Sequence, residues 1–141
     1  MANEKKPSGQ LPFVRHMVLC EHAESQPDNP RRVNLYGVLT RAVALGDPSQ
    51  FPRHFGFSVY MTLTECRHGG ASRIVVSHAD SHEVCYASQP QIMSFGIDPL
   101  AIHDIVIRVP SCKIPRPGVY LVEFEFDGVV LAQESFALVT R

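Results

Sequence analysis

The chain has 141 residues, of which 45% are hydrophobic and 19% charged, and its formal net charge is −1 at pH 7. These values are typical of a single globular domain and exclude an intrinsically disordered chain. The near-zero charge argues against binding to nucleic acid or to an anionic membrane surface. The sequence also lacks the run of about 18 apolar residues that would predict a membrane span.

The first residues form a polar segment. Residues 1–12 contain Pro7, Gly9 and Pro12 and no apolar run, so they predict a flexible tail rather than a secretory signal. The remainder, 13–141, is then one domain. We expect it in the cytoplasm, with its four cysteines reduced.

Short apolar segments separated by Pro, Gly, Asn and Asp follow along the chain. A first strand is predicted over 13–20 and, after a polar loop, a second over 33–45 with a bend at Gly37. Segment 55–66 alternates apolar and polar residues, as a half-buried strand does. Further strands are predicted at 71–79, 84–87 and 102–109, and 88–100 is read as a loop with at most one helical turn.

The most specific local signal lies near the C-terminus. Two alternating runs flank Asp127-Gly128, a dipeptide favoured in two-residue hairpin turns. Simple pairing across this turn gives one apolar face with Tyr120, Val122, Phe124, Phe126, Val129 and Leu131. Glu123, Glu125 and Glu134 fall on the other face, where they predict solvated charges rather than an acid–base pair.

About seven to nine short strands without an amphipathic helix predict an antiparallel, immunoglobulin-like β-sandwich. The chain has no G-x-S-x-G elbow, P-loop or G-x-G-x-x-G motif, and His103 and Asp104, adjacent on a strand, point to opposite faces. The pattern therefore favours a non-enzymatic binding or interaction module. Exposed sheet edges make pairing with a protein partner, or with a second copy of the chain, the expected mode.

One stretch raises the question of a metal site. Residues 66–85, CRHGGASRIVVSHADSHEVC, contain two cysteines and three histidines. A two-residue turn at 69–70 would pair Met61 with His78, Thr62 with Ser77 and Leu63 with Val76. That register puts His78 on the opposite face from Cys66 and His68, and roughly 17 Å along the strand at the β rise per residue. One zinc ion cannot reach both ends.

The far end of this stretch keeps a smaller ligand set, His78-x3-His82-x2-Cys85. Two imidazoles and a thiolate are good zinc ligands, and a turn over 79–83 would bring them together. A zinc-binding protein or a metal-dependent hydrolase is therefore the alternative function. The competing interpretation is structural: His78 packs at a strand end, His82 is exposed in the turn and Cys85 is buried.

Two polar features accompany the first strand. Cys20 and His22 are two residues apart, so they share a strand face and either ligate a metal together or simply mark a strand edge. Arg31 and Arg32 follow the proline-bearing segment 24–30, which is either a recognition surface or a solvated loop.

Four segments carry a longer pattern: HMVLCEHA, RRVNLYGVLTRA, SQFP and PGVYLVEFEFDGVVLAQESFALV. They resemble a family of uncharacterised bacterial β-sandwich proteins. In that family a first strand ends in Cys and an acidic residue, an Asn-Leu-x-Gly-Val strand follows, and a Pro-Gly-x-Tyr strand and an Asp-Gly hairpin close the chain. The matching positions here are Cys20-Glu21, Asn34 to Val38, Pro117 to Tyr120 and Asp127-Gly128. The resemblance covers nearly everything after residue 12 and implies a bacterial source and an immunoglobulin-like or similar sandwich, but no activity.

Overall fold

A computed structural model of the protein describes residues 11–39, 42–44 and 48–139. Of the predicted tail and domain, residues 1–10 and 140–141 lie outside the described part. The strands are β1 (Phe13–Gln26), β2 (Asn29–Val38), β3 (Ala42–Ala44), β4 (Arg53–Thr64), β5 (Gly70–His78), β6 (Val84–Ala87), β7 (Gln91–Met93), β8 (His103–Ile114), β9 (Gly118–Phe126) and β10 (Val129–Val139), with one 3-10 turn, Pro48–Gln50. No helix in these ranges is long and apolar enough to cross a membrane.

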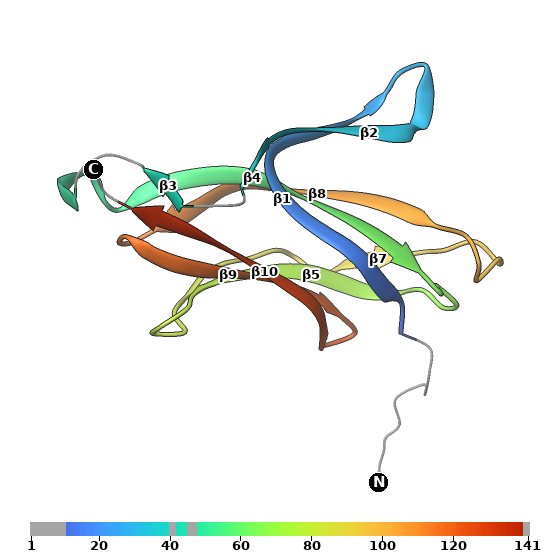
Figure 1. Ribbon diagram of the computed structural model, residues 1–141. Coiled ribbons are helices and arrows are strands. Elements are labelled where there is room, and N and C mark those ends of the chain that lie inside the picture. Colours follow the sequence, from blue (N-terminus) through green and yellow to red (C-terminus); the bar gives the residue numbers. More distant parts are fainter. Residues whose placement is uncertain (1–10, 40–41, 45–47, 140–141) are drawn as a thin grey trace, which may run out of the picture.

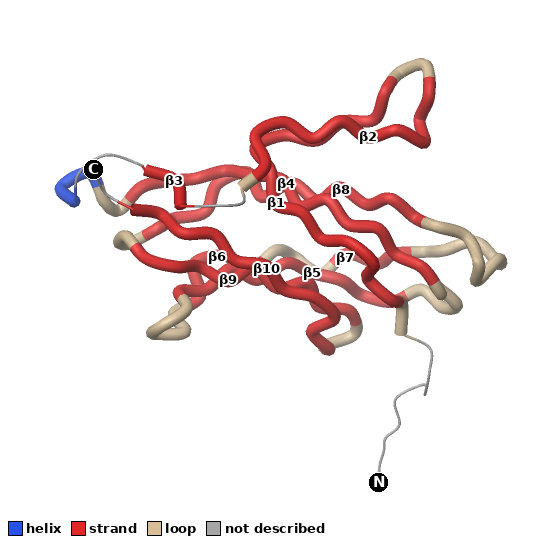
Figure 2. Tube along the Cα trace, in the orientation of Figure 1, coloured by secondary structure: helices blue, strands red, loops and turns tan. Residues whose placement is uncertain are grey.

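The strands form two sheets that face each other (Figures 1 and 2). One sheet has the order β2-β1-β4-β8; the other has the order β3-β10-β9-β5-β6, with β7 also paired to β5. The short β3 pairs in parallel with β10, and the other strand pairs are antiparallel. The predicted all-β antiparallel sandwich is confirmed.

The core lies between the two sheets and follows the alternation in the sequence. The inward residues of β4 are fully buried: Phe57, Val59, Met61 and Leu63. They meet the equally buried face of β9, made of Tyr120, Val122, Phe124 and Phe126. Aromatic rings connect the layers, with the Phe57 and Phe136 ring centroids 5.4 Å apart. Burial of these apolar side chains is the main force holding the sheets together.

The hairpin predicted around residues 69–70 is wrong. Met61 pairs with Met17 and Ile105 in the first sheet, whereas His78 pairs with Tyr120 in the second. The connection after β4, where Glu65 has a φ of 58°, carries the chain across from one sheet to the other. Both strands keep an apolar face, but the faces meet across the core rather than side by side.

The C-terminal hairpin forms as predicted at its turn and then changes register. Phe126 pairs with Val129, but a bulge after Val130 shifts the later pairs by one residue, so that Val122 faces Glu134. The bulge brings Phe136 and Leu138 into the core. The predicted common face of Glu134 with Glu123 and Glu125 is therefore wrong.

The first strand is longer than predicted and changes partner. It pairs with β4 as far as Cys20 and with β2 from Cys20 to Gln26. Residues 21–37 thus form a two-stranded hairpin, which we call the arm. The predicted polar loop is its outer half. Its tip stands clear of both sheets (Figure 1). Gly37, with a φ of 65°, provides the bend expected at this position.

Candidate interaction site

The three proposed zinc ligands lie around the end of β5. His78 is only 5% exposed, its ring packs edge-on against Tyr120 with centroids 5.0 Å apart, and its Nδ1 accepts a 3.3 Å hydrogen bond from the Ser81 amide. His82 is exposed in the turn that follows, with a φ of 63°. Cys85 is partly exposed in β6. The buried imidazole thus contacts the Tyr120 ring and Ser81, and the His82 amide donates a 2.8 Å hydrogen bond to the His78 carbonyl.

In the described part of the chain, no group of three or more His, Cys, Asp and Glu is arranged to hold a metal ion. The thiol also opposes ligation, because burial and the Glu83 carboxylate raise the pKa of Cys85. Zinc binds the thiolate, so a raised pKa lowers its affinity at neutral pH.

Protein purified without chelator or affinity tag should therefore contain far less than one equivalent of zinc. The measurement is elemental analysis by mass spectrometry, with a His82→Ala variant prepared in parallel. A full equivalent in the parent protein that disappears in this variant would support the metal-binding hypothesis instead.

The other cysteines are buried: Cys20, Cys66 and Cys112. Burial raises the pKa of each of these thiols, and that of Cys112 reaches about 12. They are therefore protonated and poorly nucleophilic at neutral pH. The Cys20 and His22 side chains also lie in different environments. Cys20 is fully buried, whereas His22 is exposed on the arm, with its Nε2 3.2 Å from the Glu24 carboxylate.

Polar side chains from distant parts of the sequence meet on the surface, and local motifs do not reveal them. His54 Nδ1 lies 2.9 Å from the Ser111 hydroxyl on neighbouring strands, in an exposed position. No described carboxylate contacts this histidine, so the pair lacks the third group that orients a catalytic triad. Glu125 accepts a 2.8 Å bond from Arg73, and this ion pair occupies the predicted carboxylate face.

The most unusual surface feature is the loop between β7 and β8, residues 94–102. Ile97, Leu100 and Ile102 have relative exposures of 102%, 84% and 57%. Phe13, exposed by 58%, lies at the same end of the first sheet, because it pairs with Thr64. We call these four side chains the loop-end surface. A contiguous exposed apolar patch is one sign of an interaction site.

Local hydrogen bonds and a partly buried aromatic ring hold this loop in place. Asp98 accepts a 2.9 Å hydrogen bond from the Leu100 amide through its side chain and a 3.1 Å bond from the Ala101 amide through its carbonyl. The Phe95 ring packs on His103 and Phe126 at its root. The backbone that carries the exposed aliphatic side chains is therefore held in a defined conformation, which lowers the entropy cost of ordering the loop.

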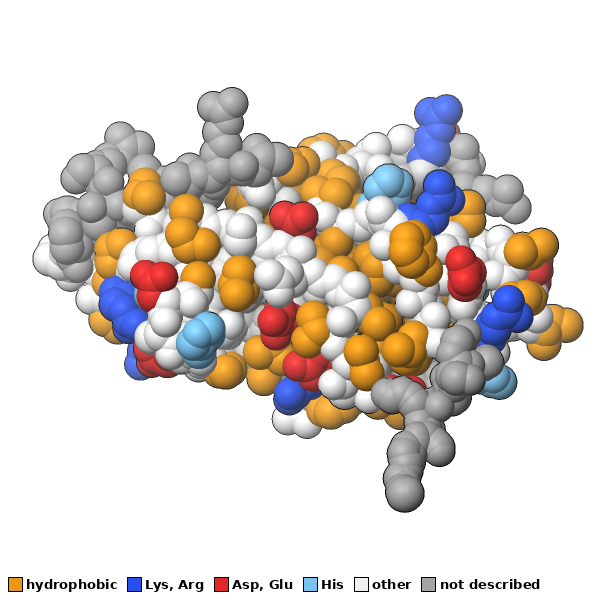
Figure 3. All heavy atoms as spheres, turned by 60° about the horizontal axis from the view of Figure 1, so that its bottom comes forward, with side chains coloured by type: hydrophobic (Ala, Val, Ile, Leu, Met, Phe, Trp, Pro, Cys, Tyr) orange, Lys and Arg blue, Asp and Glu red, His pale blue; other side chains and the backbone are white. Residues whose placement is uncertain are grey.

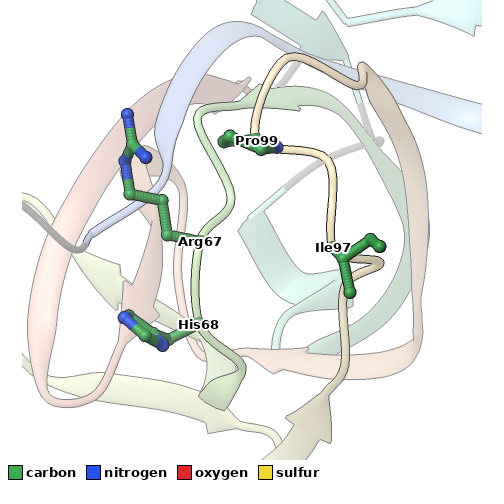
Figure 4. Close-up of a pocket in the computed structure, with 4 residues that line it drawn as sticks. All are labelled: Arg67, His68, Ile97 and Pro99. Carbon is green, nitrogen blue, oxygen red and sulfur yellow. The ribbon is translucent and has the colours of Figure 1, made fainter.

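A shallow hollow of about 330 Å³ separates this loop from the β4–β5 connection (Figure 4). Arg67 and His68 come from the connection and Ile97 and Pro99 from the loop, and the basic side chains project to one side of the hollow while Ile97 projects to the other. Figure 3 shows hydrophobic, basic, acidic and histidine side chains together at this right-hand end of the molecule. Around the hollow itself, Ile97 and Pro99 lie opposite Arg67 and His68.

A buried polar atom lies under the same loop. His103 Nε2 is inaccessible and has no hydrogen-bond partner among the described residues. A buried nitrogen without a partner costs about 1–3 kcal/mol of stability. His103 follows the 94–102 loop at the start of β8.

The predicted recognition loop at Arg31 and Arg32 is the tip of the arm, where the Arg31 side chain lies outside the described residues and Arg32 is exposed. Behind the tip, one face of the arm is a polar network. The His22 and Tyr36 rings stack 5.9 Å apart, and both contact the Glu24 carboxylate. The arm is therefore a structured hairpin and not a solvated loop.

Comparison with known proteins identifies the family. Residues 15–139 match the model of a family of unknown function, DUF6941, and the chain belongs to that family. The curated protein sequences contain no match. The fold is similar to part of a solved structure, "Pseudomonas fluorescens alkylpurine DNA glycosylase AlkC bound to DNA containing an abasic site analog", with a TM-score of 0.54 and 13% identity. The similarity covers 90% of this chain but only 30% of the glycosylase, and at this identity it shows the fold alone.

Proposed function

We propose that the protein is a non-enzymatic interaction module that binds a protein partner through the loop-end surface. The exposure of Ile97, Leu100 and Ile102 on one hydrogen-bonded loop is the observation that carries this proposal. Full burial of each side chain contributes about 1.5–3 kcal/mol, so the three together supply about 4.5–9 kcal/mol toward the cost of association. Arg67 and His68 then form a polar rim, as in other protein interfaces.

The proposal includes an immunoglobulin-like fold for the sandwich. Two observations support it. The short β3 runs parallel to β10 at one sheet edge, and the Tyr120 hydroxyl, near the start of β9, donates a hydrogen bond to the Arg116 carbonyl. A tyrosine bonded back to the chain a few residues upstream is the tyrosine corner of such domains. We also propose a bacterial source, from the resemblance, and a cytoplasmic setting, which the free thiols support.

The test is affinity capture from the native cells with a double variant, Ile97→Asp and Leu100→Asp. We expect proteins retained by the parent chain to be recovered at least about tenfold less with this variant, because two charges would enter an apolar contact. The matched control is Val119→Asp with Val130→Asp, since both valines are 46% exposed on strands of the other sheet.

The control should keep the captured protein. Quantitative mass spectrometry provides the readout, and far-UV circular dichroism establishes that all three chains are folded. Equal recovery by the two double variants, or no protein enriched by the parent chain over the bare resin, would refute the loop-end surface as the binding site.

A further inference from the structure

The arm has a long strand edge with no neighbour. Within the described residues β2 pairs with β1 alone, and its outer edge is open from Asn29 to Val38. A two-stranded hairpin by itself is marginally stable in water, and an open edge pairs readily with another strand. A hairpin that stands clear of its own domain is therefore expected to find its third strand elsewhere.

The other open edges are less suited to this. The outer strands β3, β6 and β7 have only three, four and three residues. The edge strand β8 contains Pro110, which lacks the amide hydrogen that a ladder needs. Strand β10 is covered by β3 over residues 137–139, and its free part contains the bulge near Leu131. Bulges and prolines on edges discourage pairing between chains. The outer edge of β2 is thus the one most open to a partner strand.

We propose that two copies of the chain dimerise by antiparallel pairing of their β2 edges around a two-fold axis at Asn34. The hydrophobic pattern selects this register, because Val33 then lies opposite Leu35 of the second copy, and the reverse. An axis between Asn34 and Leu35 would instead place a polar residue opposite an apolar one. An axis at Leu35 would leave Val33 opposite Gly37 and lose half of the apolar contact.

Charge on the other face of the arm fits the same register. Arg32 is exposed, and no described side chain pairs with it. An axis at Asn34 places its guanidinium opposite Tyr36 of the second copy, whose hydroxyl donates a 3.4 Å hydrogen bond to Glu24. A cation over an aromatic ring beside a carboxylate is favourable, and the symmetry provides it twice.

The expected affinity is modest. A single strand pair buries less than the roughly 1,600 Å² of a standard interface, so the dimer should form at about micromolar concentration. This inference is independent of the proposed function, because the arm and the loop-end surface are made of different residues.

Disulfide trapping tests the register. In a Cys85→Ser background the remaining native thiols are buried. Asn34→Cys should then oxidise to a covalent dimer, because directly opposite residues in an antiparallel pair have Cα atoms about 4.5–5.5 Å apart, within disulfide range. Non-reducing electrophoresis provides the readout.

The matched control is Glu24→Cys. Glu24 pairs with Asn34 on the same hairpin, but one strand farther from the axis. Two copies of this residue would be about 14 Å apart, three strand spacings, and should not form a disulfide. Equal trapping of the two cysteines, or none of Asn34→Cys, would overturn the proposal.

Sedimentation equilibrium tests the dimer without a covalent bond. Leu35→Lys should weaken association at least about tenfold, because it places a charge in the apolar contact. The loop-end variant with Ile97→Asp and Leu100→Asp should dimerise like the parent chain, so the two proposals fail separately. A parent chain that stays monomeric at about 100 µM, well above the expected dissociation constant, would refute the dimer.

Discussion

Replacing Phe57 by alanine should lower the free energy of unfolding by about 3–5 kcal/mol. The Phe57 side chain is fully buried in β4, and its ring lies 5.8 Å from that of Phe55 and 5.4 Å from that of Phe136 on the opposite sheet. Removing it takes away aromatic contacts and leaves a cavity between the layers. The loss is a large part of the 5–15 kcal/mol that stabilises an ordinary domain, and equilibrium urea unfolding would measure it.

The same substitution at Phe13 is the control. Phe13 is 58% exposed at the loop end, so its replacement by alanine should change the free energy of unfolding by less than about 1 kcal/mol. Comparable losses for the two variants would mean that the sheets are not held together by the layer of aromatic rings around Phe57.

The sequence was informative where side-chain alternation and turn chemistry act over short distances. The predicted strand at 84–87 is β6, and Asp127-Gly128 forms the expected turn, with φ of 52° and 81°. The apolar pattern of the sequence also indicates the bulge in β10. Val129 and Leu131 occupy odd positions, whereas the buried Phe136 and Leu138 occupy even ones. A change of parity within one strand indicates an inserted residue.

Long-range pairing was not predictable in the same way. A glycine pair between two alternating runs is equally compatible with a hairpin and with a crossing between layers, because both arrangements bury the same faces. The choice depends on partners far away in the sequence: Met61 lies beside Ile105, and His78 beside Tyr120. No local pattern around residues 69–70 contains that information.

Part of the arm and the whole loop-end surface escaped prediction, for opposite reasons. Residues 21–32 are mostly polar and are held by pairs such as Gln26 with Asn34 at 3.1 Å, so apolar alternation revealed only the second half of the arm, within the strand predicted over 33–45. The loop at 94–102 contains apolar residues that sequence reasoning expects to be buried. Only the three-dimensional arrangement shows that nothing in the described chain covers Ile97 and Leu100.

Gly118→Ala should destabilise the protein by about 2–4 kcal/mol, through backbone strain and a steric clash together. Gly118 has a φ of 149°, and a Cβ at this position would lie 2.6 Å from His78 Nε2. The imidazole cannot easily retreat, because it is buried against the Tyr120 ring. The effect is measured by urea unfolding of the variant and its parent.

Alanine substitutions at two other glycines separate the cost of backbone strain from the cost of the steric clash. Gly128, with a φ of 81° and open space at its Cβ position, should lose about 1–2 kcal/mol on replacement by alanine, from strain alone. Gly96 also has open space and no left-handed φ, so its alanine variant should be neutral within about 0.5 kcal/mol.

Adding His78→Ala to Gly118→Ala should make the double variant less destabilised than the sum of the two single variants. Additive effects would mean that His78 does not limit the space at Gly118, and that backbone strain is the entire cost.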